Sequence, residues 1–256
     1  MTSRLQWTSL CLGICAVCVL AVPAQGQSLA HAEALWKSRD YDGANREFRA
    51  LVAEQPKNPG LRVRWAQLFV ERFNKEEAVN LYREALQIKP DDTGALLGIA
   101  SVMAEGFEAT AKEYALKALA VDPKLYRAHE ILARVALEDN DIPAAVSECD
   151  KALSSFPDAL DGMTIRATVD WLADRKDSPW IGKILAIDPR YGQAYATAGY
   201  YFVLNRRYDE GIELYRKALA VSPDLWSARS QLGVNLMRMG KEEEARAELE
   251  IGRAHV

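Results

Sequence analysis

The chain has 256 residues, of which 49% are hydrophobic and 27% are charged, and its formal net charge at pH 7 is −4. This is the composition of an ordinary globular protein with enough apolar side chains to build a core. The mildly acidic balance and the lack of any long lysine and arginine run argue against a surface that binds nucleic acid.

The first 26 residues have the layout of a secretory signal peptide. Arg4 is the one charged residue, an apolar run extends from Leu10 to Val22, and the small residues Ala24 and Gly26 follow. The apolar run has 13 residues, whereas a helix that spans a bilayer needs about 20. We therefore expect cleavage after Gly26 and export to the periplasm or the extracellular space. The alternative is an uncleaved segment that anchors the protein in the membrane.

Three of the four cysteines, Cys11, Cys15 and Cys18, lie in this segment. Cleavage leaves Cys149 alone, so no internal disulfide can form. We expect Cys149 to be a small residue of the core.

The rest of the chain contains an internal repeat that is marked by prolines. Six of them are separated by 34, 33, 34, 32 and 34 residues: Pro56, Pro90, Pro123, Pro157, Pro189 and Pro223. Each proline follows a segment with apolar residues at helical spacing, and proline ends a helix because it lacks an N–H donor. A second helical pattern precedes each of these segments. One unit is therefore a helix, a short turn, a second helix and a proline-marked turn.

Two positions in each unit hold alanine or glycine. The eighth position gives Ala66, Ala100, Ala133, Gly199 and Gly233, and the twentieth gives Ala44, Ala78, Ala111, Ala145, Gly211 and Ala245. Small side chains allow helices to approach closely, so we expect the helices to pack at these positions.

These positions resemble the tetratricopeptide repeat family, whose 34-residue unit has the pattern W…L-G…Y…A…F…A…P. The unit at 192–225 matches it with Tyr195, Ala198, Gly199, Phe202, Gly211, Tyr215, Ala218 and Pro223. The unit at 59–92 matches with Trp65, Ala66, Phe69, Ala78, Tyr82, Ala85 and Pro90. In the unit at 126–158, Cys149 stands where the family has a packed aromatic residue, which favours burial of its side chain.

The resemblance implies an all-α fold, a right-handed α-α superhelical solenoid of about seven helix pairs with the last one truncated. We expect an array over residues 27–250, with repeats near 27–58, 59–92, 93–125, 126–158, 159–191, 192–225 and 226–250. The fifth repeat departs from the pattern because Asp177 occupies the position of a small residue. Ser178 and Pro179 predict an N-cap and a first helical residue, so this helix starts late.

Arrays of this family bind peptides or partner helices in a curved groove that is lined mainly by the first helix of each pair. The family's groove positions correspond here to Arg64, Gln67, Glu71, Arg127, Glu130, Arg134, Tyr200, Gln231 and Arg238. Arg127 and Arg134 have two interpretations. They hold a peptide carboxylate, or they pair with Glu130 and Glu138 on the same helix and solvate it. No asparagine occupies the ninth positions, which excludes the family's clamp for C-terminal carboxylates.

No motif points to catalysis. The histidines His31, His129 and His255 form no H-E-x-x-H pattern, and the sequence has no G-x-S-x-G, P-loop or G-x-G-x-x-G. We therefore expect no enzymatic activity, no metal and no cofactor. His129 fits a packed structural role.

The sequence thus predicts an exported, non-catalytic scaffold for protein–protein interaction in the cell envelope of a bacterium. Its partner would be a protein or a peptide, and we expect no nucleic acid and no membrane span after signal cleavage. An alternative is that the array is the N-terminal part of a larger exported enzyme, such as a metallopeptidase. A third interpretation is a purely structural spacer.

The last six residues, 251–256, read IGRAHV and break the repeat register, which predicts a proline near position 257. This hexapeptide resembles the translation of a sequencing-adapter oligonucleotide joined to a truncated gene. We hold a non-native tail as a hypothesis, and a native tail is the alternative.

Overall fold

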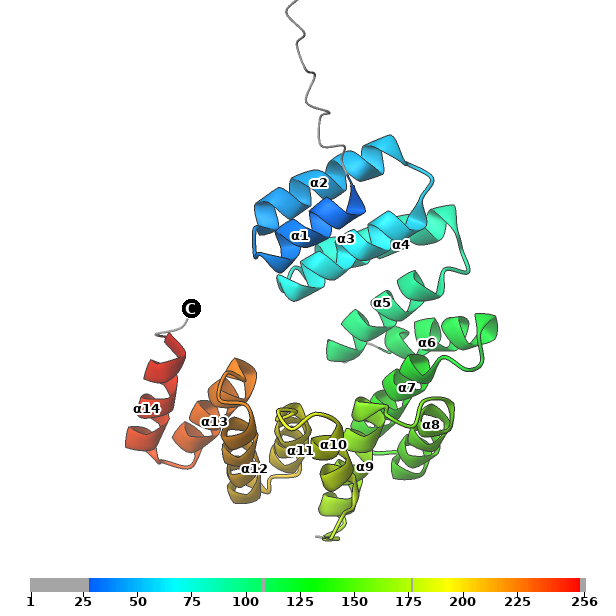
Figure 1. The fold of residues 1–256 in the computed structure, drawn as a ribbon. Helices are drawn as coiled ribbons and strands as arrows, with labels where there is room; N and C mark the ends of the chain where they lie inside the picture. The colour runs from blue at the N-terminus through cyan, green and yellow to red at the C-terminus, as the bar shows by residue number, and fades with distance from the viewer. Residues whose placement is uncertain (1–27, 107–108, 176, 254–256) are drawn as a thin grey trace, which may run out of the picture. The chain divides into compact units, whose positions relative to one another are not determined.

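The computed structural model describes residues 28–106, 109–175 and 177–253. In these ranges it contains fourteen α-helices and no strand (Figure 1). In chain order they are α1 (Leu29–Lys37), α2 (Tyr41–Glu54), α3 (Pro59–Glu71), α4 (Lys75–Ile88), α5 (Thr93–Glu105), α6 (Thr110–Val121), α7 (Tyr126–Glu138), α8 (Ile142–Ser155), α9 (Leu160–Leu172), α10 (Trp180–Ile187), α11 (Gln193–Leu204), α12 (Tyr208–Val221), α13 (Trp226–Arg238) and α14 (Glu242–Arg253). The prediction of an all-α solenoid of about seven helix pairs is confirmed.

The proposed signal segment, 1–26, lies outside the described residues, as do residues 254–256 of the proposed tail. Within the described ranges no helix is long and apolar enough to cross a membrane.

The chain divides into two compact units, residues 1–51 and 52–256. In the first unit, Trp36 of α1 meets Phe48 of α2 edge to face, with ring centroids 6.4 Å apart. Ala32, Ala44 and Phe48 are fully buried there. The N-terminus of α1 is capped by Ser28, whose side chain accepts a hydrogen bond from the His31 N–H.

In the second unit, each helix packs against the next one along the chain from α3 to α10 and from α11 to α14, and α11 packs against α9. The first helices of neighbouring pairs also contact each other, which places α3, α5, α7, α9, α11 and α13 in one row. Each helix packs against the other helix of its pair, and each pair packs against the neighbouring pairs, as expected for stacked repeats.

Tight turns join the two helices of most pairs. One residue in each such turn has a left-handed backbone, with φ between +57° and +73°: Arg39, Phe73, Asn140, Asp174, Arg206 and Gly240. The next residue then donates its N–H to a carbonyl five residues earlier, as Asn74 does to Phe69 at 2.9 Å. This closure satisfies carbonyls that the end of the first helix leaves free. It also fixes the angle at which the second helix leaves.

The small residues lie where the sequence predicted helix contacts. All the alanines at the eighth and twentieth positions are fully buried. In the repeat with glycine at both positions, the two backbones are in close contact. A Cβ added at Gly211 would lie 3.0 Å from the Gly199 carbonyl oxygen and 2.7 Å from a methyl carbon of Val203.

Cys149 is fully buried, in a cluster with Ala133, Leu137, Ala145 and Ile165, so its predicted core role is confirmed. Burial raises the pKa of its thiol to about 12. The thiol therefore stays protonated and unreactive near neutral pH.

The fifth pair contains a shortened second helix, as predicted, because α10 has eight residues and starts at Trp180. The predicted cap is wrong in detail. Pro179 holds the N-cap position, and the Ser178 hydroxyl donates instead to Asp170 at 2.9 Å. Asp170 also accepts from Arg175 at 2.6 Å. The Asp170 carboxylate near the end of α9 therefore stabilises the turn. The Ser178 hydroxyl bonds to this carboxylate and does not cap α10.

Neighbouring pairs also approach closely where Tyr82 of α4 packs on Gly98 of α5. Substitution of two glycines tests how much this contact matters. A Cβ at Gly98 would lie 2.2 Å from the buried ring of Tyr82, whereas a Cβ at Gly182 would meet nothing within 4 Å. Alanine is the better helix former by about 0.5–1 kcal/mol. We therefore expect Gly182→Ala to stabilise the protein by roughly that amount. Gly98→Ala should destabilise it by about 1–3 kcal/mol through overpacking.

Urea unfolding followed by circular dichroism measures both effects. Equal stabilisation by the two substitutions would contradict the close packing of Tyr82 on α5.

Candidate functional site

Two adjoining hollows lie along the row of first helices. The central hollow, about 500 Å³, is lined by residues of α3, α4, α5, α7 and the start of α9, with Tyr191. The tyrosine pocket, about 270 Å³, is lined by residues of α5, α7, α9, α11, α12 and α13 and contains Tyr200, Tyr201 and Tyr215. Arg134 and Asp161 line both. We refer to the two hollows together as the groove, and their linings draw on six helix pairs, from α3 and α4 to α13 and α14.

Six of the nine predicted groove residues line these hollows. The central hollow contains Gln67, Arg127, Glu130 and Arg134, and the tyrosine pocket contains Arg134, Tyr200 and Gln231. The other three, Arg64, Glu71 and Arg238, line neither hollow. Arg64 donates to the Gln67 side chain at 2.7 Å. Arg238 lies over the ring of Tyr208, 5.2 Å from its centroid.

Neither interpretation of the two arginines included the contacts that the structure shows. Arg134 reaches Asp161 of the next repeat at 3.4 Å, and Tyr191 donates to the other oxygen of Asp161 at 2.8 Å. Arg127 donates to the Tyr126 hydroxyl at 3.2 Å, which raises the pKa of Arg127. Neither arginine forms an ion pair with Glu130 or Glu138 within α7, although the charge of Arg134 acts to lower the pKa of both carboxyl groups. Asp161 lies in the first turn of α9, where it faces Arg134 across the contact between repeats.

Glu130 has a structural role that the sequence did not indicate. Its carboxylate accepts a hydrogen bond from the Gly162 N–H at 3.0 Å, and the residue is 7% exposed. Ala159, at the N-cap of α9, has no side-chain cap to offer. Glu130 thus satisfies an N–H at the start of the next repeat's helix. Burial, and next the nearby charge of Asp161, raise the pKa of Glu130 to about 7.

Sequence reasoning missed several lining residues. Asp161 and Thr164 follow Arg127 and Glu130 by 34 residues, so the repeat register itself could have identified them. Tyr191 and Tyr215 come from a turn and from the second helix α12. No rule based on the first helices would select them.

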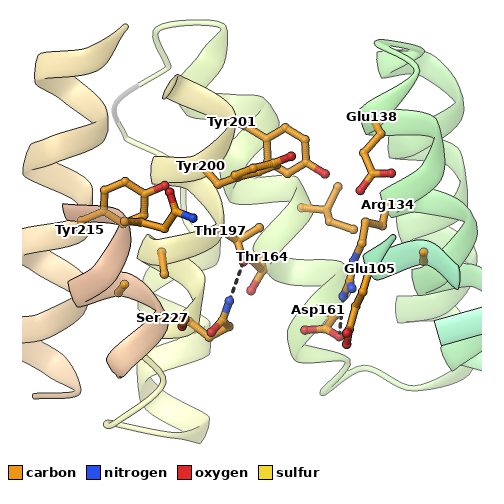
Figure 2. Close-up of a pocket in the computed structure, with 16 residues that line it drawn as sticks. Glu105, Arg134, Glu138, Asp161, Thr164, Thr197, Tyr200, Tyr201, Tyr215 and Ser227 are labelled. Carbon is orange, nitrogen blue, oxygen red and sulfur yellow. Dashed lines mark hydrogen bonds and ion pairs between the residues drawn. The ribbon is translucent and has the colours of Figure 1, made fainter. Parts of the chain in front are cut away.

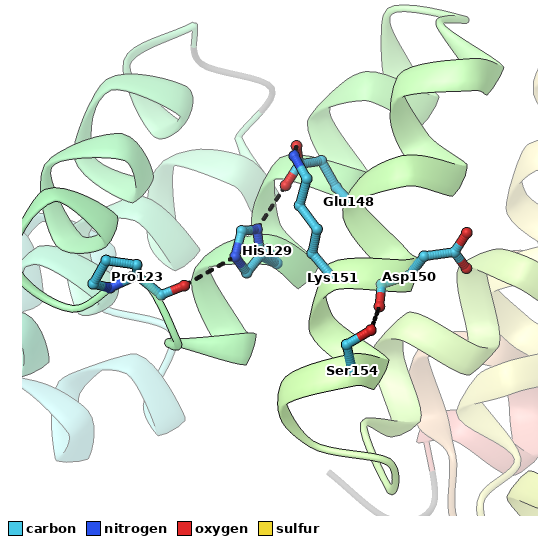
Figure 3. A network of polar contacts seen from close by, with 6 residues as sticks. All are labelled: Pro123, His129, Glu148, Asp150, Lys151 and Ser154. Carbon is cyan, nitrogen blue, oxygen red and sulfur yellow. Dashed lines mark hydrogen bonds and ion pairs between the residues drawn. The ribbon is translucent and has the colours of Figure 1, made fainter.

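His129 lies on the other face of α7, away from the groove, and the predicted packed histidine is confirmed. It is 8% exposed, its Nδ1 is 2.7 Å from Glu148 of α8, and its Nε2 is 3.4 Å from the Pro123 carbonyl oxygen (Figure 3). Burial acts to raise the pKa of Glu148, but hydrogen bonds from Lys151 and His129 lower it overall. In the described part of the chain, no three histidine, cysteine, aspartate or glutamate residues are grouped so that they could hold a metal ion.

Comparison with known proteins identifies the family. One tetratricopeptide repeat model matches residues 29–93 and 103–159, and a second matches residues 192–225. The chain belongs to the tetratricopeptide repeat family. Membership supports a role in protein–protein interaction, because such repeat arrays use their concave surfaces for binding.

Solved structures share the fold at low identity. A tetratricopeptide repeat protein from Parabacteroides merdae is 15% identical, with a TM-score of 0.63, and the match covers 88% of this chain and 90% of that one. A thermophilic one from Thermus thermophilus is 18% identical, with a TM-score of 0.57 and coverage of 70% and 100%. A chain of the APC/C hetero-tetramer Cut9–Hcn1 is 14% identical, with a TM-score of 0.65, and the match covers 88% of this chain and 45% of that one. No curated protein sequence matches the chain.

The raised pKa of Glu130 makes stability depend on pH. Because the folded pKa is about 7 and the ordinary value is 4.5, the unfolded chain releases this proton first. The free energy of unfolding should therefore fall as pH rises from about 5 to 8. In Glu130→Gln the amide oxygen can still accept from Gly162, but the charge is gone. We expect this variant to lose on the order of 2 kcal/mol less than the wild type over that range.

Urea unfolding at a series of pH values measures the difference. Glu113→Gln on α6 is the matched control, because Glu113 is exposed there. A Glu130→Gln profile parallel to the wild-type profile would contradict the buried carboxylate.

Proposed function

We propose that this protein is a non-catalytic scaffold that binds a peptide or a partner helix in the groove, and that it acts in the cell envelope after export. The observation that carries the proposal is the shared lining of the groove. Side chains from α3, α5, α7, α9, α11 and α13 face the two adjoining hollows. A ligand that follows these helices would contact several repeats at once, as in helix-in-groove recognition.

The groove also has the chemistry of a recognition surface. The rings of Tyr126 and Phe156 pack against each other at a tilt of 31°, with centroids 4.6 Å apart, at the central hollow, and three tyrosines line the pocket beside it. Aromatic and arginine side chains are the residues most enriched at energetically important positions of protein interfaces. Such a surface supports binding of a polypeptide rather than chemistry on a small substrate.

Site-specific photo-crosslinking tests the groove. Benzoylphenylalanine would replace the exposed groove residues Gln67 and Gln231, and in matched controls the exposed Arg83 and Glu113 of the second helices α4 and α6. We expect one partner band at both groove positions and none at the controls. Crosslinks only from the second helices would contradict binding in the groove.

Export is supported by the signal-peptide pattern of residues 1–26. Mass spectrometry of the mature N-terminus is expected to find residue 27 first. An intact Met1 in the cytoplasmic fraction would contradict export, while the groove proposal would still stand on its own test.

A further inference from the structure

The tyrosine pocket contains two buried hydroxyl groups without a hydrogen-bond partner. They are Thr164 Oγ1 on α9 and Tyr215 Oη on α12, in residues that are 3% and 1% exposed. Both residues line the pocket. Buried polar groups in native proteins nearly always have a partner, so each exception calls for an explanation. Two exceptions in one small pocket point to a ligand that supplies the missing partners.

The same pocket has an excess of negative charge. Its lining includes Glu105, Glu138 and Asp161 but only one basic residue, Arg134. Arg134 is engaged by Asp161, and Glu105 pairs with Lys75 at 3.2 Å. Within the described ranges, Glu138 has neither an ion pair nor a hydrogen bond, and burial raises its pKa to about 7 although the nearby charge of Arg134 acts to lower it. A carboxylate held in this way is stabilised by an incoming cation.

The arrangement places the carboxylates and the aromatic rings around one space. Arg134, Glu138 and Asp161 lie on one side, Tyr215 lies on the other, and Tyr200 and Tyr201 lie between them (Figure 2). A volume of about 270 Å³ falls just below the range typical of drug-sized ligands, which fits a single long side chain. Tyrosine rings favour a cation near their faces.

We propose that the tyrosine pocket accepts one lysine or arginine side chain of a bound peptide, with its charge beside Glu138 and with polar groups of the peptide bonded to the Thr164 and Tyr215 hydroxyls. This deepens the proposed function and rests on it: the groove binds the polypeptide, and the pocket selects a basic residue. An acidic peptide held by Arg134 is the competing outcome.

Peptide libraries with one fixed residue test the selection. Fluorescent dodecapeptides with degenerate flanks would carry lysine, arginine, norleucine or glutamate at a central position, and binding to the purified protein would be measured by anisotropy. Norleucine matches the lysine stem without its charge. We expect the better basic library to bind at least about tenfold tighter than norleucine. Equal or tighter binding of the norleucine or glutamate library would overturn the inference.

Three conservative variants test whether the preference for a basic residue depends on the tyrosine pocket. Glu138→Gln removes the charge, and Thr164→Val and Tyr215→Phe remove the unpartnered hydroxyls while keeping the shape. Each should weaken binding of the basic library by roughly threefold to tenfold. Because the hydroxyls have no partner in the free protein, Thr164→Val and Tyr215→Phe should leave Tm unchanged or raise it. Glu113→Gln is the control: it should leave the affinity unchanged, and it should change Tm little because it removes only an exposed ion pair with Lys117.

The outcomes separate this inference from the proposed function. Unchanged affinity in all three variants, with crosslinks still confined to Gln67 and Gln231, would overturn the basic-residue pocket and leave the groove in place. Loss of the groove crosslinks would overturn both. A fall in Tm for Thr164→Val and Tyr215→Phe would show that the hydroxyls have structural partners, and would also count against the pocket.

Discussion

Close contact between helices at small residues is the constraint on which the rest of this structure depends. Alanine or glycine at the eighth and twentieth positions of a repeat lets the two backbones approach until a carbonyl oxygen lies within reach of a Cβ, as at Gly199 and Gly211. Between pairs, the ring of Tyr82 fills the space that Gly98 leaves. The first helices thereby lie side by side in one row. Their remaining side chains, at positions such as those of Gln67 and Arg134, line the groove.

Buried polar groups differ in their hydrogen bonding between the two hollows of this groove. At the central hollow, Glu130 accepts from Gly162 and couples one repeat to the next, although burial of its carboxylate acts against ionisation. At the tyrosine pocket, two hydroxyls remain without partners. A site that binds a ligand often gives up some stability of the free protein in this way. Under the proposed function, Glu130 has a structural role in the groove and the two hydroxyls have a role in recognition.

The sequence predicted the fold well because each repeat restates the same spacing. Proline intervals, small residues and the position of Cys149 all follow from a helix pair that stacks on its neighbours, and the structure confirms each. The site was predicted less completely. Arg127 and Arg134 line the hollows, and Arg134 pairs with Asp161 of the following repeat. That contact joins two repeats, so the spacing of residues within one helix cannot predict it. Ser178 also differs from the prediction, because its hydroxyl donates to the Asp170 carboxylate of the preceding helix instead of capping α10.

Glutamine side-chain amides offer the most direct test of where a partner binds. Gln67, Gln193 and Gln231 line the groove, whereas Gln87 lies exposed on the second helix α4. Titration of the ¹⁵N-labelled protein with the tightest peptide from the basic library should shift the side-chain amide signals of the three groove glutamines and leave that of Gln87 in place. A shift of the Gln87 signal without any change at the other three would contradict a partner-binding groove on the first helices.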